Sequence, residues 1–309
     1  MLTFDKLKLV TTLSDIIIND KSVFVSTVEN ETITALKYHQ DKPYLLNIKI
    51  DYTSREVVIE FTGKVLGRRY KELISIKTIR DCFSTINDLG FCTIDVDSVL
   101  EHAEVVQCDV TSDVNCDNVP QLCSYIRSHI SNYNQFKCSL LRNGNLTIER
   151  NVTTKKYKRR MVIYDKAQEM AKKENRAFVE ANEIQGDFDG KCRLEVNLNN
   201  KMQIRDNLGI PDNNIMTVLS ATLNPVRSFL CEAVRDTSPE EYSDRKTYFT
   251  YLVLRDCDFD LAKVEAKMRE LYRKGTNISL VMQPYRDMCD KMDKTNRNSS
   301  FQSILNQIS

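Results

Sequence analysis

The chain has 309 residues and a mass of 35.8 kDa, which suits one large domain or two modest ones. Hydrophobic residues make up 41% of it, charged residues 28%, and the formal net charge is +1. This composition excludes a disordered chain, a collagen-like repeat and a small disulfide-stabilised protein. No apolar run approaches the roughly 20 residues that cross a bilayer, and the N-terminus lacks the apolar segment of a signal peptide. We therefore expect a cytoplasmic protein.

Several familiar chemistries are excluded by what the sequence lacks. The ten cysteines include no Cys-x-x-Cys pair, so we expect reduced and mostly buried thiols rather than zinc ligands. The eight glycines form no phosphate-binding loop, which argues against a nucleotide-driven motor or a Rossmann dehydrogenase. The three histidines are far apart in the sequence. Any metal would therefore be held mainly by carboxylates, which favours a hard ion such as Mg²⁺ or Mn²⁺.

The first 75 residues alternate like β-strands, with a hairpin where segments 45–51 and 55–61 flank a polar turn. Segments 76–89 and 118–133 have helical spacing, and we expect both to pack on the apolar face of a sheet. The pattern also predicts a helix starting over 165–174 and five strands, at 103–111, 136–141, 146–151, 159–164 and 191–198. The sequence has no recognisable internal repeat.

Beyond residue 200 the periodicity becomes helical, and strand signals nearly vanish. Helices are predicted at 215–223, 225–234, 239–254, 261–273 and 278–292. We expect Leu219, Leu223, Phe229 and Leu230 to be buried. The sequence therefore predicts an α+β domain over residues 1–200 and a mainly helical region over residues 201–309.

Two of the predicted strands carry carboxylates on a polar face. Asp109 and Asp113 share one face of their strand, and the opposite face is apolar. Acidic residues are disfavoured in strands, so the presence of two of them on one strand needs an explanation. A divalent-metal site is one interpretation. The others are two solvated carboxylates on an edge strand, or a turn aspartate at the end of the strand. In the later strand, Arg193, Glu195 and Asn197 share the polar face, which a half-exposed strand also explains.

A basic segment precedes a strand that ends in a tyrosine. Residues 155–160 hold five lysines and arginines around Tyr157, and the following strand ends at Tyr164, just before Lys166. Basic residues interleaved with a tyrosine suit a phosphate backbone. A tyrosine hydroxyl beside a lysine and a metal can attack a phosphodiester. The alternative is a solvent-exposed basic loop followed by a core tyrosine.

Taken in order, three segments resemble the motifs of a known family. They are Cys-Asp-Val-Thr-Ser-Asp (108–113), Val-Ile-Tyr-Asp-Lys-Ala-Gln-Glu (162–169) and Arg-Leu-Glu-Val (193–196). Over roughly residues 100–200 the chain resembles the rolling-circle replication initiators of small plasmids and filamentous phages, the gene II/X type. The resemblance implies an antiparallel sheet with helices on one face. It also implies a nickase whose tyrosine becomes joined to the 5′ end of the cut strand and frees a 3′-OH.

The resemblance also implies residue roles. Asp109, Asp113 and Glu195 would hold Mg²⁺ or Mn²⁺, and Lys166 would contact the scissile phosphate or neutralise the phenolate. The segment in which plasmid members carry the nucleophile reads Leu-Thr-Ile-Glu-Arg-Asn-Val here and has no tyrosine. The nucleophile is then Tyr164, which the matched motif contains, or Tyr157 in the basic loop, or nicking has been lost. The expected DNA-binding residues are Lys155, Lys156, Lys158, Arg159, Arg160 and Arg193.

The implied partners are single-stranded or hairpin DNA at an origin, a host helicase and a second copy of the chain. A nickase requires Asp109, Asp113 and Glu195 to converge on one face of one sheet, with a tyrosine hydroxyl close by. One alternative is a non-catalytic origin- or hairpin-binding protein on the same fold, in which Tyr157 stacks on a base. The other is an unrelated phage or mobile-element protein, in which the three carboxylates lie far apart.

Overall fold

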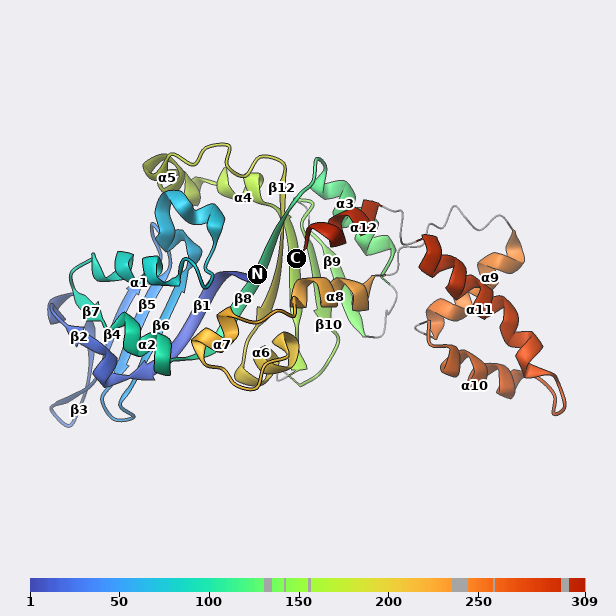
Figure 1. Ribbon diagram of the computed structural model, residues 1–309, viewed down its shortest axis with the longest axis horizontal. Helices are drawn as coiled ribbons and strands as arrows, with labels where there is room; N and C mark the ends of the chain where they lie inside the picture. Colours follow the sequence, from blue (N-terminus) through green and yellow to red (C-terminus); the bar gives the residue numbers. More distant parts are fainter. Residues whose placement is uncertain are drawn as a thin grey trace.

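The computed structural model describes residues 1–130, 135–141, 143–154, 157–234, 244–257, 259–295 and 300–308. The fold is α+β, and its centre is an antiparallel ten-stranded sheet in the order β3-β4-β5-β6-β1-β8-β12-β11-β10-β9 (Figure 1). Its strands are β1 (Thr3–Thr12), β3 (Val25–Glu29), β4 (Thr32–Gln40), β5 (Leu46–Asp51), β6 (Glu56–Thr62), β8 (Glu104–Asn115), β9 (Phe136–Leu140), β10 (Leu146–Arg150), β11 (Arg160–Asp165) and β12 (Lys191–Leu198). Two short strands, β2 (Ile16–Ile18) and β7 (Cys92–Ile94), form a separate pair.

The strand order of the sheet repeats. From the centre outwards, β1-β6-β5-β4-β3 and β8-β12-β11-β10-β9 both follow the order first, fifth, fourth, third and second strand. The two first strands, β1 and β8, pair antiparallel in the middle. We call the two halves the N-terminal unit (β1 and β3–β6) and the C-terminal unit (β8–β12). The sequence showed no repeat because the two units share their topology and not their residues.

One face of the sheet is apolar and covered by helices, since alternate strand residues point to the same side. Phe83 packs on Phe61 of β6 with ring centroids 5.7 Å apart, and Phe229 packs on Phe136 of β9 at 5.4 Å. The expected packing of segments 76–89 and 118–133 is confirmed for the residues that the structure describes. The helices of this layer are α1 (Ile79–Asn87), α2 (Val96–His102), α3 (Val119–Ser128), α6 (Lys201–Leu208), α7 (Ile215–Leu219), α8 (Pro225–Ala233) and α12 (Ser300–Gln307).

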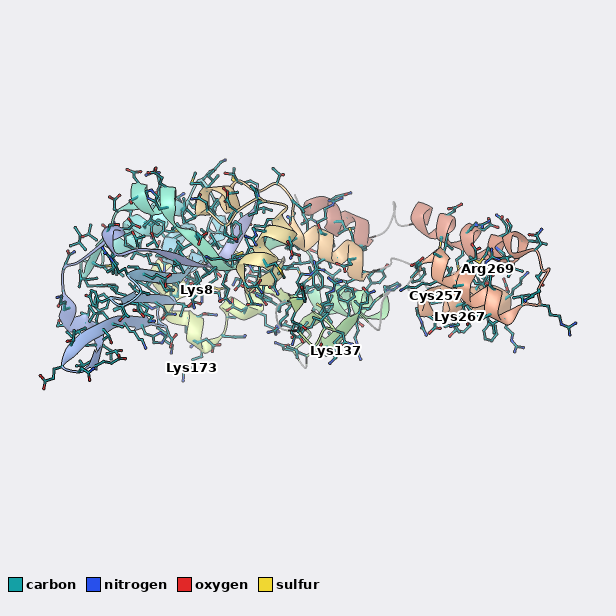
Figure 2. The ribbon with its side chains drawn as sticks, turned by 90° about the horizontal axis from the view of Figure 1, so that it is seen from below. Lys8, Lys137, Lys173, Cys257, Lys267 and Arg269 are labelled. Atoms are coloured by element: carbon teal, nitrogen blue, oxygen red, sulfur yellow. The ribbon has the colours of Figure 1, made fainter. Side chains whose placement is uncertain are left out.

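The opposite face of the sheet is polar. Across five adjacent strands, the register places Lys6, Asp109, Asn197, Arg160 and Glu149 side by side in one row. Opposite charges alternate along much of this row, which stabilises neighbouring strands. Figure 2 shows Lys137 of β9 on the side of the sheet away from the helices α1 and α2.

A smaller layer covers one end of the polar face (Figure 1). It consists of the 3₁₀ segment η3 (Gly63–Glu72), α4 (Lys166–Met170), α5 (Lys173–Asn182) and the loop 183–190. Residues 63–72 were expected to be strand, and the structure corrects this. The layer has its own apolar cluster, formed by Tyr70, Leu73, Met170, Phe178, Ile184 and Phe188. We call it the cover.

The helices that follow residue 200 form two groups, which pack around different apolar clusters. Helices α6, α7, α8 and α12 belong to the main core, where Leu219, Phe229 and Leu230 are buried as predicted. Leu223, expected to be buried, is 46% exposed. Helices α9 (Arg245–Asp256), α10 (Leu261–Leu271) and α11 (Ile278–Thr295) instead surround their own cluster, which includes Leu254. This helical unit is inserted between α8 and α12, and Figure 2 labels Cys257, Lys267 and Arg269 within it.

Candidate functional site

Tyr164 and Glu195 meet on the polar face of the C-terminal unit. The register sets Val162 opposite Glu195 and Tyr164 opposite Arg193, so the tyrosine and the glutamate are diagonal neighbours on one face. The Tyr164 hydroxyl donates a hydrogen bond of 2.7 Å to Oε1 of Glu195. Tyr164 is 9% exposed. The pair therefore combines a nucleophilic oxygen with a carboxylate positioned to receive its proton.

Arg193 lies beside this pair on the same face of the sheet, directly opposite Tyr164, and is fully buried. It faces Asp113 of β8 directly and donates two hydrogen bonds to its carboxylate, from Nε at 2.7 Å and from Nη2 at 2.8 Å. Its Nη1 also donates to Oδ1 of Asp5 at 2.8 Å. Because the side chain is 0% exposed and bound within the protein, the prediction that Arg193 contacts DNA is wrong.

The hydroxyl of Tyr70 is the centre of a buried polar network. It donates to Oδ1 of Asp5 at 2.8 Å and accepts from Nζ of Lys166 at 2.8 Å and from Nη1 of Arg193 at 2.9 Å. We call Asp5, Tyr70, Lys166 and Arg193 the hub. It joins the cover to the central strands of the sheet, and two of its members, Asp5 and Tyr70, were not identified from the sequence.

A shift in the pairing register of β1 directs the side chain of Asp5 toward the hub. Phe4 pairs with Val110 and Lys6 with Asp109, so the register slips between Phe4 and Lys6. Such bulges redirect a side chain and are common beside active sites. The sequence signal is a break in alternation, since two polar residues, Asp5 and Lys6, stand between the apolar Phe4 and Leu7.

Lys166 was predicted to be catalytic, and the structure places it in the hub. The side chain is 2% exposed, and Nζ also donates to Oε2 of Glu169 at 2.7 Å. Glu169 accepts in turn from Nδ2 of Asn175 at 2.7 Å. The ammonium lies 5.6 Å from the ring centroid of Tyr164. Lys166 therefore supplies positive charge close to the tyrosine from a fixed, buried position.

Burial and neighbouring charges give Tyr164 and Glu195 unusual proton affinities. Burial, reinforced by the charge of Asp5, raises the pKa of Glu195 to about 7. Burial and the nearby Glu195 raise the pKa of Tyr164 well above its ordinary value. Burial opposes ionisation of Asp5, but the cations Arg193 and Lys166 outweigh it and lower the pKa of that carboxyl. Near neutral pH the site thus holds a protonated phenol against a carboxyl group close to its midpoint.

The three predicted metal ligands share one face but do not form one centre. Both oxygens of Asp113 accept from Arg193, and Asp109 accepts from Asn197 at 2.8 Å. Asp109 and Asp113 are four residues apart on a strand, roughly 13 Å. Within the described ranges, no group of three His, Cys, Asp or Glu side chains is arranged to hold a metal ion. As it stands, this donor set does not fit Mg²⁺ or Mn²⁺.

Tyr157, the second candidate nucleophile, lies away from this site. It precedes β11, whereas Tyr164 lies near the end of that strand, so the two are roughly 20 Å apart along an extended chain. Tyr157 is 52% exposed. This exposure suits a contact with a nucleic-acid base better than participation in the buried hub.

Three of the basic residues next to Tyr157 form ion pairs within the protein. Lys158 Nζ lies 3.0 Å from Glu149, and the guanidinium of Arg160 lies 3.8 Å from the same carboxylate. Arg159 donates to Glu232 at 2.7 Å. The other two predicted DNA-binding residues, Lys155 and Lys156, lie outside the residues that the structure describes.

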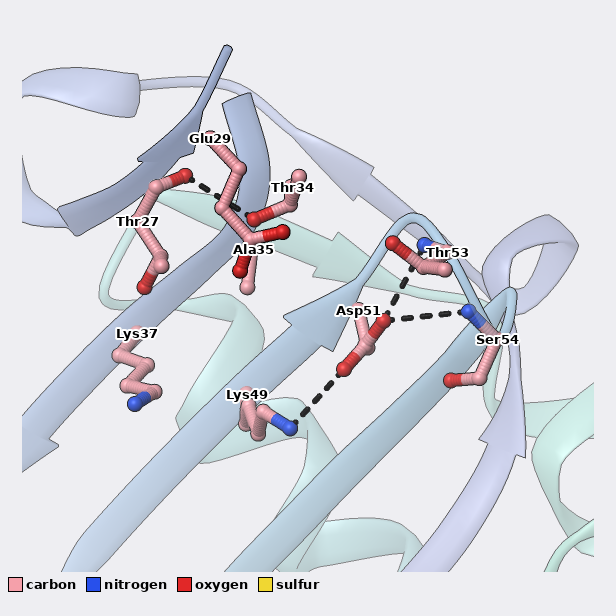
Figure 3. Close-up of a pocket in the computed structure, with 9 residues that line it drawn as sticks. All are labelled: Thr27, Glu29, Thr34, Ala35, Lys37, Lys49, Asp51, Thr53 and Ser54. Carbon is pink, nitrogen blue, oxygen red and sulfur yellow. Dashed lines mark hydrogen bonds and ion pairs between the residues drawn. The ribbon is translucent and has the colours of Figure 1, made fainter. Parts of the chain in front are cut away.

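A hollow of about 490 Å³ opens on the polar face of the N-terminal unit, over β3, β4 and β5 (Figure 3). Lys49 donates to Asp51 at 3.0 Å within it, and Asp51 also accepts from the backbone of the turn that follows. The remaining lining is Thr27, Glu29, Thr34, Ala35, Lys37, Thr53 and Ser54. The charges in this hollow balance, and it lacks a nucleophile paired with a buried base. The Tyr164–Glu195 pair is therefore the stronger candidate site.

The sequence matches no protein-family model, and none of the curated proteins matches it. No helix among the described residues is long and apolar enough to cross a membrane.

Proposed function

We propose that this protein is a DNA replication initiator that nicks one strand at an origin by attack of Tyr164 on a phosphodiester. Rolling-circle replication and mobilisation of a plasmid, phage or other mobile element both use this chemistry. The observation that carries the proposal is the 2.7 Å hydrogen bond from the Tyr164 hydroxyl to Glu195. The buried cations Lys166 and Arg193 support it, because they place positive charge near the attacking oxygen.

In the proposed reaction, Oη of Tyr164 forms a bond to phosphorus while its proton passes to Oε1 of Glu195. The bond from phosphorus to the 3′ oxygen breaks, and that oxygen takes a proton from solvent. The 5′ phosphate stays on the tyrosine, and the released 3′-OH primes synthesis. A base with a pKa of about 7 suits this step, since it is half deprotonated near neutral pH and still holds a proton well.

A divalent cation remains part of the proposal as a prediction from the family resemblance. Asp113 would have to release Arg193 before it could bind Mg²⁺ or Mn²⁺, because the guanidinium occupies both carboxylate oxygens. We therefore assign the proton transfer to Glu195 and route no step through a metal. The proposed partners are single-stranded or hairpin DNA at an origin, with a host helicase and a second copy of the chain.

The test is a covalent-adduct assay with labelled single-stranded DNA that carries a candidate origin, in Mn²⁺ and in EDTA. We expect a protein–DNA adduct on a denaturing gel, lost in Tyr164→Phe and kept in Tyr157→Phe. The reverse pattern would assign the nucleophile to Tyr157. Absence of an adduct on DNA that the protein binds would overturn the nickase, and dependence on Mn²⁺ would support the predicted metal.

A second candidate is a protein that binds the origin or a hairpin without nicking it. It is favoured by the 52% exposure of Tyr157 beside Lys158 and by the burial of Tyr164. In that case Tyr157→Ala weakens DNA binding by about 1–3 kcal/mol through lost stacking, and Tyr164→Phe leaves binding unchanged. An unrelated phage or mobile-element protein would show neither binding nor an adduct.

A further inference from the structure

The inserted helical unit has an apolar core to which two of its aromatic side chains do not contribute. The buried cluster includes Leu254 of α9, Val264 of α10 and Met282 of α11. Tyr248 and Phe249, near the start of α9, lie outside this cluster and are 47% and 50% exposed. The unit can therefore fold without burying either ring, and both rings are open to a partner.

Further exposed apolar side chains lie where α10 ends and α11 begins. Leu271 and Tyr272 are 70% and 47% exposed, and Leu280 is 72% exposed. Figure 1 shows that α9 starts, α10 ends and α11 starts at the end of the unit that lies away from the sheet. The three helices alternate in direction, as short connections between packed helices favour. One end of the unit thus gathers exposed apolar side chains from all three helices.

The same end of the unit carries more basic than acidic side chains. Its exposed cations are Arg245, Lys246, Arg273 and Lys274. The carboxylates of these segments are Asp244 and Glu270, and Asp244 caps α9 by accepting from the backbone N–H of Thr247 at 2.9 Å. We call the exposed rings of Tyr248, Phe249 and Tyr272, together with the four cations, the distal surface. Its charge is positive.

Two of these cations are not neutralised within the protein. Lys267 and Arg269, which lie earlier in α10, each form an ion pair with a carboxylate of the unit. Arg273 and Lys274, by contrast, form no ion pair with any residue that the structure describes. Their charges are therefore available to a partner of opposite sign.

Arg245, Tyr248 and Phe249 form a cluster on the surface of α9. The guanidinium of Arg245 lies 5.4 Å from the ring centroid of Phe249, which is one helical turn away. The ring centroids of Tyr248 and Phe249 are 6.2 Å apart. Unpaired bases stack on aromatic rings and on guanidinium groups, while lysines and arginines neutralise the phosphates between the bases. The cluster offers both kinds of contact within one turn of helix.

We propose that the distal surface binds a single DNA strand, with its rings stacked on bases and its cations against phosphates. The inserted helical unit lies beyond β9, the outermost strand of the C-terminal unit, so this contact is separate from Tyr164 and Glu195 (Figure 1). The proposal deepens the proposed function and rests on it for the identity of the strand. A protein partner is disfavoured, because protein interfaces are depleted in lysine and this surface presents Lys246 and Lys274.

The test measures binding of a single strand that is not an origin. A fluorescent oligothymidylate of about 20 nucleotides, which spans more than one stacking site, is titrated with the whole chain and followed by anisotropy. We expect the native protein to bind it, and Phe249→Ala and Tyr272→Ala to bind about 5- to 150-fold more weakly, since each removes one stacking contact. Native protein that does not bind, or unchanged affinity in both variants, would overturn the proposal.

Conservative variants separate stacking from simple apolar contact. Phe249→Tyr keeps an aromatic ring and should bind the oligothymidylate like the native protein. Phe249→Leu keeps an apolar side chain without a ring and should bind as weakly as Phe249→Ala. Equal affinities in Phe249→Tyr and Phe249→Leu would contradict stacking and overturn the assigned base contact.

The salt dependence of binding tests the phosphate contacts. Arg273→Gln and Lys274→Gln should each reduce the slope of log K against log salt by about 0.7, the value for one phosphate contact with a single strand. Lys267→Gln is the control, because Lys267 belongs to the same unit but already pairs with Asp256. It should leave the slope unchanged. The same slope in all three variants would contradict the phosphate contacts.

Tyr52→Ala is the matched control for the rings. Tyr52 is 38% exposed and lies in the turn between β5 and β6 of the N-terminal unit. Its removal takes away an exposed ring of the same kind at another place and should leave the affinity at the native value. A loss equal to that of Tyr272→Ala would mean that the strand binds exposed rings in general, which would overturn the role of the distal surface.

Binding and nicking can fail separately. Tyr164→Phe should bind the oligothymidylate like the native protein. Weakened binding in Phe249→Ala, in a protein that forms no adduct on origin DNA, refutes the nickase and leaves the distal surface intact. An adduct in the native protein, with unchanged oligothymidylate affinity in Phe249→Ala and Tyr272→Ala, refutes the distal surface alone. A lower oligomeric state in Leu271→Ala, again with unchanged DNA affinity in the ring variants, would replace it with a contact between copies.

Discussion

Arg193 and Asp113 face each other across β12 and β8 and share two hydrogen bonds, of 2.7 and 2.8 Å. The Arg193 side chain is 0% exposed and that of Asp113 is 18% exposed, so the guanidinium is held away from water. Taking such charges out of water is costly, and the cost is offset only while both partners are present. The pair thus gives the centre of the sheet one preferred register.

The first prediction follows from that pairing. Asp113→Ala leaves the buried Arg193 with Asp5 as its remaining carboxylate partner in the hub, and we expect it to lower the free energy of unfolding by about 3–5 kcal/mol. Urea denaturation followed by circular dichroism measures the change. Glu60→Ala, which breaks longer, partly exposed pairs with two lysines, should cost less than about 1 kcal/mol. Equal losses in the two variants would contradict the assigned role of the buried pair.

The second prediction concerns the rate of nicking. Because Glu195 must be ionised to accept the Tyr164 proton, adduct formation should rise with pH through about 7. Glu195→Gln should lower the rate by about 10²- to 10⁴-fold and remove this pH step, as expected when a general base is lost. Single-turnover adduct formation from pH 5 to 9 tests both points. A Glu195→Gln rate that keeps the native pH profile would exclude Glu195 as the base.

The third prediction concerns stability and pH. The pKa of Glu195 is raised from 4.5 to about 7 in the folded protein, so between these values the native state holds a proton that the unfolded state has lost. Stability therefore falls as pH rises through this window, by up to about 3 kcal/mol. Glu195→Gln removes this loss. We expect the variant to gain stability relative to the native protein at pH 8, compared with pH 5, in urea denaturation. A difference independent of pH would contradict the raised pKa.

The fourth prediction separates the inserted helical unit from the α12 helix. Arg227 of α8 donates to the carbonyl of Leu305 at 2.6 Å, and Phe301, Ile304 and Leu305 are buried in the main core. Replacing residues 235–299 by a short flexible linker should leave the core with a cooperative transition near its native midpoint. Removing residues 300–309 instead should destabilise it strongly, since each buried apolar side chain contributes about 1.5–3 kcal/mol. Thermal melts of both deletions decide this.

Much of the sheet could be predicted from the sequence because alternation marks a half-buried strand. Segment 191–198 coincides with β12, and 136–141, 146–151 and 159–164 differ from β9, β10 and β11 by one residue at their ends. Glu195 was found because it stands on the polar side of such a strand, and Tyr164 because it ends a strand just before Lys166 within the matched motif. Their hydrogen bond depends on the register between β11 and β12, which follows from pairing across the fold and not from either strand alone.

Asp5 and Tyr70 could not be found in the same way. Asp5 reaches the hub through a slip in the pairing of β1, and the two adjacent polar residues Asp5 and Lys6 break the alternation without showing where a redirected side chain would point. Tyr70 lies in η3, where a strand was expected. Its partners are Lys166 and Arg193, 96 and 123 residues later. Contacts at such separations depend on the three-dimensional fold.

The pairing of β1 with β8 affects how the chain folds, because it joins strands that are far apart in the sequence. Thr3 donates to the carbonyl of Thr111, 108 residues away in the sequence, so the middle of the sheet closes only after both first strands exist. Until then the N-terminal unit presents β1 as an unpaired edge, which invites pairing with other chains. Pairings this distant slow folding, because a long loop must be ordered before they form. During synthesis, the β1 edge therefore stays open to pairing with other chains until β8 has left the ribosome.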